Sequence, residues 1–319
     1  MLVPLVARAG VLAEVDSALI AARAGRGTLL TVAGEPGIGK TRLAEEAAER
    51  ANGFAIVWTW GPAAGDAALG PWSRVLRVLA GGHAAVARLI ADSPFLAALT
   101  QPARAGGGRD PEGARSQLSF DLAEVIAAAA ARRPVLIVFD DAHQADTSSL
   151  RLLAELAPAL RTMPAAVLVT ARDGDRDWHG RPDMRTVLMR AGDVVSLQPL
   201  AAGDVAAVVA GVTGAPAGPG LVEVIAERSA GNPFLVTELA RQLTGPDAGL
   251  AAARAIVPDS VRALAGARLA ELSGAARDIL LAASVLGTRF RRDVLAGPAR
   301  SAAGRAPSPG TGCPRCVRR

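Results

Sequence analysis

The residues with the clearest chemical potential form one stretch of eight that fits the pattern G-x-x-x-x-G-K-[ST]. They are Gly34, Glu35, Pro36, Gly37, Ile38, Gly39, Lys40 and Thr41. The three glycines allow positive φ, so successive backbone N–H groups can turn inward around phosphate oxygens. The lysine brings a charge to the β- and γ-phosphates, and the threonine hydroxyl is placed to bind Mg²⁺. The stretch predicts a phosphate-binding loop; the alternative is a glycine-rich turn without a ligand.

Lys40 is also the only lysine in the chain, so the other 34 of its 35 basic residues are arginines. The one exception to this preference lies where a compact ammonium on a flexible stem is needed and a planar guanidinium would not substitute. This favours the phosphate-binding interpretation.

Two carboxylates, Asp140 and Asp141, directly follow the apolar run VLIVF at 135–139. Five apolar residues without alternation indicate a strand buried on both faces, as in a central parallel sheet. Such sheets present functional groups at the carboxyl ends of their strands. We therefore predict a Walker B strand, in which Asp140 holds Mg²⁺ and Asp141 orients the attacking water. Taken alone, the same pattern fits an ordinary turn equally well.

A third candidate, Arg172, follows the short apolar strand predicted at 167–170. An arginine at the tip of a neighbouring strand can reach a γ-phosphate and stabilise transition-state charge. The alternative is a surface arginine in an arginine-rich chain. Asp141, Arg172 and Lys40 are thus the predicted catalytic residues.

The elements that position these residues alternate between strand and helix up to residue 200. Strands are predicted at 28–33, 54–60, 134–139, 167–170 and 194–197, and helices at 11–24, 41–51, 72–79, 84–90 and 116–132. Residues 93–113 are rich in Pro and Gly and are expected to form a surface segment. This rhythm predicts an α/β P-loop NTPase domain over 1–200 with a doubly wound, mainly parallel five-stranded sheet.

Only helical patterns follow. Helices are expected at 203–210, 220–228 and 234–243 within a lid domain, 201–250, and at 261–272 and 275–285 within a further helical region, 251–296. Residues 297–319 lack apolar periodicity and are expected to be a disordered basic tail.

Composition limits the function classes. The chain has no apolar run of 18 residues and no basic region before its N-terminal apolar stretch, so we expect neither a membrane span nor a signal peptide, and a cytoplasmic location. From Arg289 onward eight arginines and one aspartate give +7, so the first 288 residues carry −2 of the total +5. A body of this charge argues against sequence-specific DNA binding. Cys313 and Cys316 could be half a zinc site or a redox pair, but no second pair exists and no function is expected.

With these motifs in place, the chain resembles the STAND class of AAA-like P-loop ATPases, and in particular the N-terminal ATPase module of LuxR-type, MalT-like bacterial transcriptional regulators. The resemblance extends from residue 2 to about 296. It is carried by LLTVAGEPGIGKTRLAEEAA, LIVFDDAHQAD, LVTARD and RSAGNPFLVTELARQL.

The resemblance implies roles for individual residues. Arg172 occupies the place of the family's sensor arginine, and Pro233 that of a proline packed near the nucleotide base. Without the family, Gly-Asn-Pro at 231–233 reads as a turn between helices. The family's N-terminal signature G-R-E-x-E, which lies near the nucleotide base, keeps only its arginine here, as Arg8. Gln144 replaces a tryptophan that the family usually has.

The family continues into a full winged helix, helical repeats and a C-terminal helix-turn-helix. Here the pattern breaks after about Ala296, inside a partial winged-helix region. We therefore expect a chain truncated before the output domain, with an ending typical of out-of-frame translation.

These features favour an ATP-binding signalling switch with slow Mg²⁺-dependent hydrolysis, ADP as the product state and self-association on ATP binding. The alternative is a turnover AAA-type ATPase that acts in an oligomer on a macromolecule and needs an arginine from a neighbouring subunit. A non-catalytic scaffold is less consistent with the intact motifs. GTP is disfavoured because the guanine-reading motif N-K-x-D requires a second lysine.

Overall fold

The computed structural model describes residues 5–61, 68–100, 111–174, 178, 181–242, 257–270 and 272–285. The chain divides into two compact units, residues 1–255 and 256–319. Each unit is described by itself.

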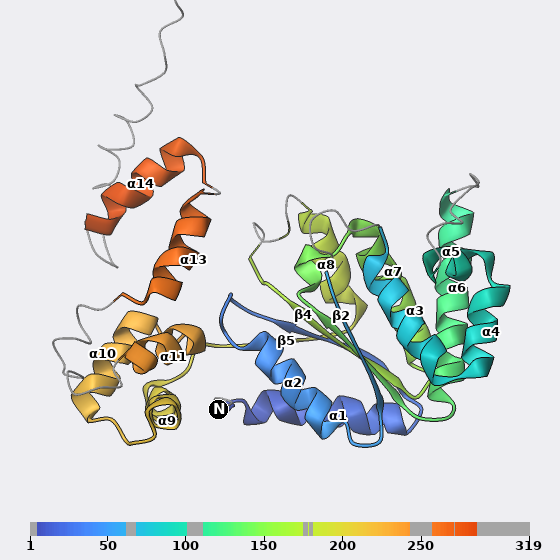
Figure 1. Ribbon diagram of the computed structural model, residues 1–319, viewed down its shortest axis with the longest axis horizontal. Coiled ribbons are helices and arrows are strands. Elements are labelled where there is room, and N and C mark those ends of the chain that lie inside the picture. Colours follow the sequence, from blue (N-terminus) through green and yellow to red (C-terminus); the bar gives the residue numbers. More distant parts are fainter. Residues whose placement is uncertain are drawn as a thin grey trace, which may run out of the picture. The chain divides into compact units, whose positions relative to one another are not determined.

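A sheet of five strands lies at the centre of the first unit (Figure 1). The strands are β1 (Thr28–Ala33), β2 (Ala55–Trp60), β3 (Val135–Asp140), β4 (Ala165–Ala171) and β5 (Asp193–Ser196). Their order is β2-β3-β4-β1-β5, and every pair is parallel. The α/β P-loop NTPase fold with a doubly wound five-stranded sheet is thereby confirmed, and the sheet is wholly parallel in the described residues.

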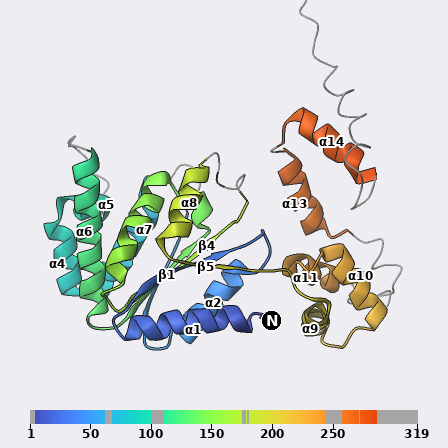
Figure 2. The same cartoon turned by 180° about the vertical axis from the view of Figure 1, so that it is seen from behind.

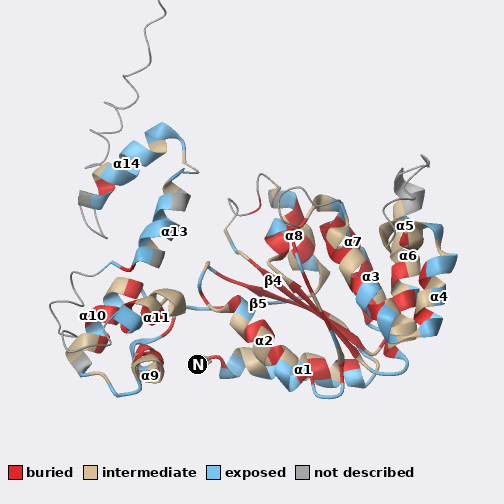
Figure 3. Ribbon diagram, viewed as in Figure 1, coloured by how far each residue is buried: buried red, intermediate tan, exposed pale blue. Residues whose placement is uncertain are grey.

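Helices cover both faces of this sheet (Figures 1 and 2). One face packs against α1 (Ala9–Arg23) and α2 (Lys40–Arg50), and the strands contribute side chains such as Leu30 and Val138 to this layer. The opposite layer is formed by α3 (Gly70–Gly82), α4 (Ala84–Asp92), α5 (Pro94–Thr100), α6 (Pro111–Ala130), α7 (Thr147–Leu160) and α8 (Pro182–Ala191). Successive strand residues point to opposite faces, so the apolar strands supply both layers. The central strands β3, up to Phe139, and β4 are buried, whereas the edge strands β2 and β5 are partly exposed (Figure 3).

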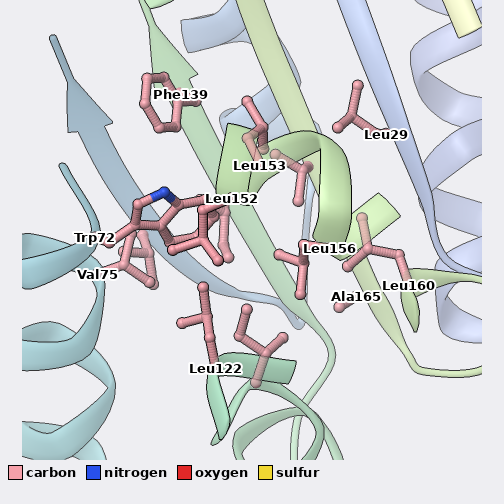
Figure 4. Packing of buried hydrophobic residues seen from close by; sticks show 14 of the residues in the cluster. Leu29, Trp72, Val75, Leu122, Phe139, Leu152, Leu153, Leu156, Leu160 and Ala165 are labelled. Atoms are coloured by element: carbon pink, nitrogen blue, oxygen red, sulfur yellow. The ribbon is translucent and has the colours of Figure 1, made fainter. Parts of the chain in front are cut away.

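The layer that contains α3–α8, the thicker of the two, has an aromatic centre (Figure 4). Trp72 and Phe139 meet edge to face with ring centroids 6.1 Å apart, a favoured aromatic geometry. The Trp72 indole N–H donates to the Ser149 carbonyl at 3.1 Å, which satisfies the one polar atom of this fully buried side chain. This packing joins α3 and α7 to the strand that ends in Asp140.

The segment predicted to lie at the surface over 93–113 contains helix at both of its ends. Residues 94–100 form α5 with Leu96 buried, and α6 begins at Pro111. Ser93 caps α5 by accepting a hydrogen bond from the Leu96 amide at 3.2 Å, and Pro94 takes the first helical position. Serine followed by proline is a helix-start signal that the Pro and Gly content of the segment obscured. Residues 101–110 lie outside the described part.

The first unit continues into three helices, α9 (Ala202–Thr213), α10 (Pro219–Ser229) and α11 (Pro233–Gln242). They pack on one another and lie where the lid helices were predicted. The second unit contains α13 (Asp259–Ala270) and α14 (Gly274–Val285). The predicted basic tail, its two cysteines and the end of the partial winged-helix region lie outside the described residues. None of the helices in the described part combines the length and hydropathy that a membrane span requires.

Candidate functional site

The loop between β1 and α2 follows the glycine pattern of its sequence. Gly34, Gly37 and Gly39 have φ of 159°, 78° and 98°, a range that residues with a side chain rarely adopt. Gly39 is the residue before α2, so the helix starts directly at Lys40. Backbone N–H groups of the loop and the helix N-terminus therefore lie together at the carboxyl edge of the sheet.

Five consecutive carbonyl oxygens of this loop, from residue 34 to residue 38, each accept a hydrogen bond. The Lys40 ammonium donates to the carbonyls of Gly34 and Glu35, both at 2.9 Å. The next three carbonyls accept from more distant parts of the chain: Pro36 from Asn232 Nδ2 at 3.0 Å, Gly37 from the Phe234 amide at 3.2 Å, and Ile38 from the Arg8 guanidinium at 3.1 Å. A trans peptide points its C=O and N–H in opposite directions, so these contacts also fix the direction of the amides that follow.

Lys40 is nearly enclosed, with 7% of its surface exposed. Burial lowers the pKa of its ammonium group, because desolvation disfavours the charged form. Asp141 opposes this shift, and nearby Arg172 adds to it. Asp173 and Asp140 also raise the pKa of this lysine, so four charged side chains that follow or end β3 and β4 act electrostatically on one ammonium. Sequence reasoning did not single out Asp173.

The two predicted metal ligands lie together although they are 99 residues apart. The Thr41 hydroxyl is 3.1 Å and 3.3 Å from the two carboxylate oxygens of Asp140 and donates to them. Thr170, at the end of β4, donates to Asp140 Oδ1 at 2.5 Å and accepts from the Asp141 amide at 2.9 Å. The Thr170 hydroxyl was missed, because a threonine in VLVT reads as an ordinary strand residue.

Asp141 leaves the strand in an unusual conformation, with φ 50° and ψ 45°. Left-handed non-glycine residues are uncommon, although aspartate tolerates the region better than most. Gln144 Nε2 donates to Asp141 Oδ2 at 3.3 Å, and the buried His143 places Nδ1 3.7 Å from Asp141 Oδ1. The turn thereby holds the second carboxylate clear of the strand.

Two adjacent cavities open along the loop. The smaller, about 290 Å³, is lined by Lys40, Thr41, Asp141 and Arg172 together with loop residues and Phe234. The larger, about 400 Å³, is mainly apolar and includes Arg8, Ile38, Leu200, Pro233 and Phe234 in its lining. Both cavities are lined by Gly37, Gly39, Arg42 and Phe234. Of the predicted site residues, Arg8 and Pro233 thus line the larger cavity, and Lys40, Thr41, Asp141 and Arg172 line the smaller one. Asp140 lines neither cavity and adjoins the smaller one through its contact with Thr41.

Arg8 connects the loop to the segment after β5. Its guanidinium donates to the Gln198 carbonyl at 2.7 Å and to the Ile38 carbonyl, and 7% of the residue is exposed. Burial lowers the pKa of this arginine, while Asp204 raises it. A guanidinium that is buried to this extent needs its hydrogen bonds to the backbone acceptors to offset the cost of desolvation.

This loop, the two carboxylates after β3 and the parallel sheet can be compared with known proteins. The sequence profile of the AAA ATPase domain matches residues 4–169. The chain belongs to the AAA ATPase domain family. The matched region contains Arg8, the loop 34–41 and the carboxylates of Asp140 and Asp141, and it ends within β4, before Arg172 and Pro233.

Several solved structures are similar to this chain. The ORC2 protein of Aeropyrum pernix is similar in fold, with a TM-score of 0.59 at 15% identity over 94% of this chain and 81% of that one. Cdc6p from Pyrobaculum aerophilum matches with a TM-score of 0.46 at 15% identity, over 95% of this chain and 82% of that one. A STAND protein with a tetratricopeptide repeat sensor, PH0952 from Pyrococcus horikoshii, matches with a TM-score of 0.45 at 16% identity, over 88% of this chain. The match covers 35% of that protein's length. No curated protein matches the chain in sequence.

Proposed function

We propose that the chain is an ATP-dependent conformational switch, the STAND-type ATPase module of a LuxR-type transcriptional regulator, with slow Mg²⁺-dependent hydrolysis. The observation that carries this proposal is the contact between the loop and the lid, which consists of α9–α11 and the turn before α11. Asn232 Nδ2 and the Phe234 amide donate to the carbonyls of Pro36 and Gly37. A loop that rearranges around phosphates must therefore change its contacts with α11.

The residues around the smaller cavity suit a triphosphate and its metal. Hydroxyl and carboxylate oxygens are the ligands that Mg²⁺ prefers, and Thr41 and Asp140 offer both within 3.3 Å of each other. These two residues would hold the ion, which neutralises phosphate charge when bound. Lys40 would exchange its two carbonyl acceptors for phosphate oxygens, where a charge-assisted contact is stronger.

Asp141 and Arg172 carry the proposed chemistry. Asp141 stands clear of the strand and would orient water for attack on the γ-phosphate. Arg172 lines the same cavity and would stabilise the negative charge that develops on the transferred group.

The larger cavity would take the nucleotide base. Its lining is mainly apolar, as for most sites that bind a flat heterocycle, and it includes Pro233 and Arg8. The ORC2 structure with a similar fold was solved with ADPNP and ADP, so this fold accommodates adenine nucleotides. ATP, ADP and Mg²⁺ are accordingly the proposed ligands.

Switching would follow from a difference between the two nucleotide states. A ligand shifts a conformational equilibrium only by its differential affinity for the two states, and the γ-phosphate is the group by which ATP and ADP differ. That group would lie beside Lys40, Asp141 and Arg172, in a cavity that Phe234 of α11 also lines. Hydrolysis would release the lid to its ADP position, and the ATP state would favour self-association.

Hydrogen exchange of α11 tests this proposal. The exchange rates of the amides of residues 234–242 should differ at least threefold, in either direction, between a non-hydrolysable ATP analogue with Mg²⁺ and Mg·ADP. The reason is that the lid would respond to the γ-phosphate. Lys40→Ala serves as the control, since it removes the phosphate contact and should abolish the difference. Equal exchange in both nucleotide states, with binding verified by calorimetry, would contradict the switch.

Hydrolysis per protomer should also be slow and independent of protein concentration. A steep rise with concentration would instead support a turnover AAA-type ATPase that acts as an oligomer. No sequence-specific DNA binding is expected from this chain alone.

A further inference from the structure

One arginine outside both cavities contacts the segment that follows Asp141. Arg181 precedes α8, and its guanidinium donates to the Ala145 carbonyl at 2.7 Å and to the His143 carbonyl at 3.3 Å. The third nitrogen, Nε, donates to the Trp178 carbonyl at 3.3 Å. Three acceptors around one planar group require the rigid fork of arginine, which a lysine ammonium cannot reproduce.

Trp178 connects the same arginine to the second strand end. Its indole is fully buried in the thicker layer, and Nε1 donates to the Arg172 carbonyl at 3.0 Å. The Arg181 amide in turn donates to the Trp178 carbonyl at 2.9 Å. Trp178 and Arg181 therefore contact both segments that leave β3 and β4, the one after Asp141 and the one that carries Arg172.

The Asp141 turn needs such support. It starts with an aspartate in the left-handed region and continues through the short 3₁₀ helix η2 (Ala142–Gln144). Sparsely populated backbone conformations persist only where surrounding contacts hold them. Two of the three Arg181 acceptors, the carbonyls of His143 and Ala145, lie in or directly after this short helix. Neither Arg181 nor Trp178 is among the residues that line the two cavities.

We propose that Arg181 and Trp178 are positioning residues for ATP hydrolysis: Arg181 fixes the turn that presents Asp141, and Trp178 fixes the backbone that presents Arg172. This inference rests on the proposed function, since it assigns Asp141 and Arg172 to the hydrolytic step. Both residues act on the geometry of the reaction and leave nucleotide affinity to the loop.

Arg181→Met tests the first contact in the full chain. Single-turnover hydrolysis of Mg·ATP should fall about tenfold, because a small misplacement of a reacting group is costly. The dissociation constant of Mg·ATP should change less than twofold. Arg181→Lys should recover part of the rate through one of the three contacts. Arg190→Met, at an exposed arginine in the last turn of α8, is the matched control and should leave the rate unchanged.

Double variants separate positioning from general destabilisation. In an Asp141→Asn background, Arg181→Met should cause no further loss of rate, since its effect passes through that carboxylate. Trp178→Phe keeps the ring but removes the N–H donor; it should slow hydrolysis about threefold alone and not at all with Arg172→Ala. Additive losses in either background, or a parallel loss of nucleotide affinity, would overturn the proposal.

Hydrogen exchange without nucleotide gives an independent reading. Arg181→Met should speed exchange of the amides of residues 141–146 and leave those of residues 37–43 unchanged, relative to Arg190→Met. Unchanged exchange at 141–146 would refute the Arg181 contact whatever the kinetics. If Arg181→Met speeds exchange at 141–146 but the wild-type protein does not hydrolyse ATP, the Arg181 contacts would be supported. The proposed function would be refuted instead.

Discussion

The two sides of the loop 34–41 are built from different kinds of contact. On the strand side, side-chain oxygens of Thr41, Asp140 and Thr170 meet one another. On the lid side, Arg8 and Asn232 donate to backbone carbonyls of the loop. Oxygens gathered around one point suit a cation and a reacting water, whereas donors to carbonyls determine the shape of the loop. Under the proposed function, one short segment therefore connects a chemical half of the site, on the strand side, with a conformational half, on the lid side.

Asp141→Asn is expected to have the largest effect and should act on the chemical half alone. Hydrolysis should fall by about 10²- to 10⁴-fold, the usual contribution of a group that positions or accepts a proton. ATP binding, measured by calorimetry, should stay within about twofold because the metal pair is intact. Asp140→Asn is the companion variant, and it should shift the Mg²⁺ dependence of binding to higher concentration. Wild-type turnover in both variants would show that the strand end is not the reaction centre.

Lys40 lies at the boundary between the two halves. The rate at which its amine is acylated reports on its protonation and on its contact with phosphate. Burial lowers the pKa of this ammonium, so the neutral, reactive amine should appear at lower pH than for a free lysine. Bound phosphates should raise the pKa again; a rise of one unit slows acylation about tenfold below the pKa.

Mass spectrometry of the single lysine-containing peptide, with and without Mg·ATP, measures this change against the N-terminal amine. Equal labelling of Lys40 at saturating nucleotide would mean that the ammonium does not contact phosphate.

Asn232→Ala should have the smallest effect and should act on the conformational half. It removes the donor to the Pro36 carbonyl and one of the two acceptors of the Phe234 amide, which keeps its contact with the Gly37 carbonyl. Each lost hydrogen bond is worth about 1 kcal/mol. Amides of α11 should exchange about five- to tenfold faster, while single-turnover hydrolysis should change less than threefold. Asn52, the only other asparagine and an exposed one, supplies the matched control Asn52→Ala. If the hydrolysis rate fell by the same factor by which α11 exchange rose, the two halves could not be treated as separate.

The chemical half was largely predictable from sequence. Loop residues 34–41 and the carboxylates 140 and 141 occur in short contiguous patterns whose residue types suit the proposed phosphate and metal chemistry. The parallel sheet followed from unbroken apolar runs such as 135–139, and the structure confirms it. Thr170 escaped notice because its hydroxyl has a role only once β4 lies beside β3.

The conformational half was predictable only in outline. Asn232 and Pro36 are 196 residues apart, and the contact uses a backbone carbonyl, which any residue offers. Arg8 came from a family resemblance, and nothing in composition distinguishes it or Arg181 from more than thirty other arginines. Such contacts depend on where the folded backbone turns, and residue type alone carries little of that information.

Four residues that line both cavities have a consequence for inhibitor chemistry. Gly37 leaves almost no spare room, since a methyl group there would lie 2.9 Å from both Asn232 Oδ1 and Phe234 Cβ. An uncharged compound that fills the larger, apolar cavity would press on this glycine and on Phe234, and so act on the phosphate side without a phosphate mimic. The contacts of such a compound would then include side chains of α11, Phe234, Thr237 and Glu238, and not only the glycine-rich loop.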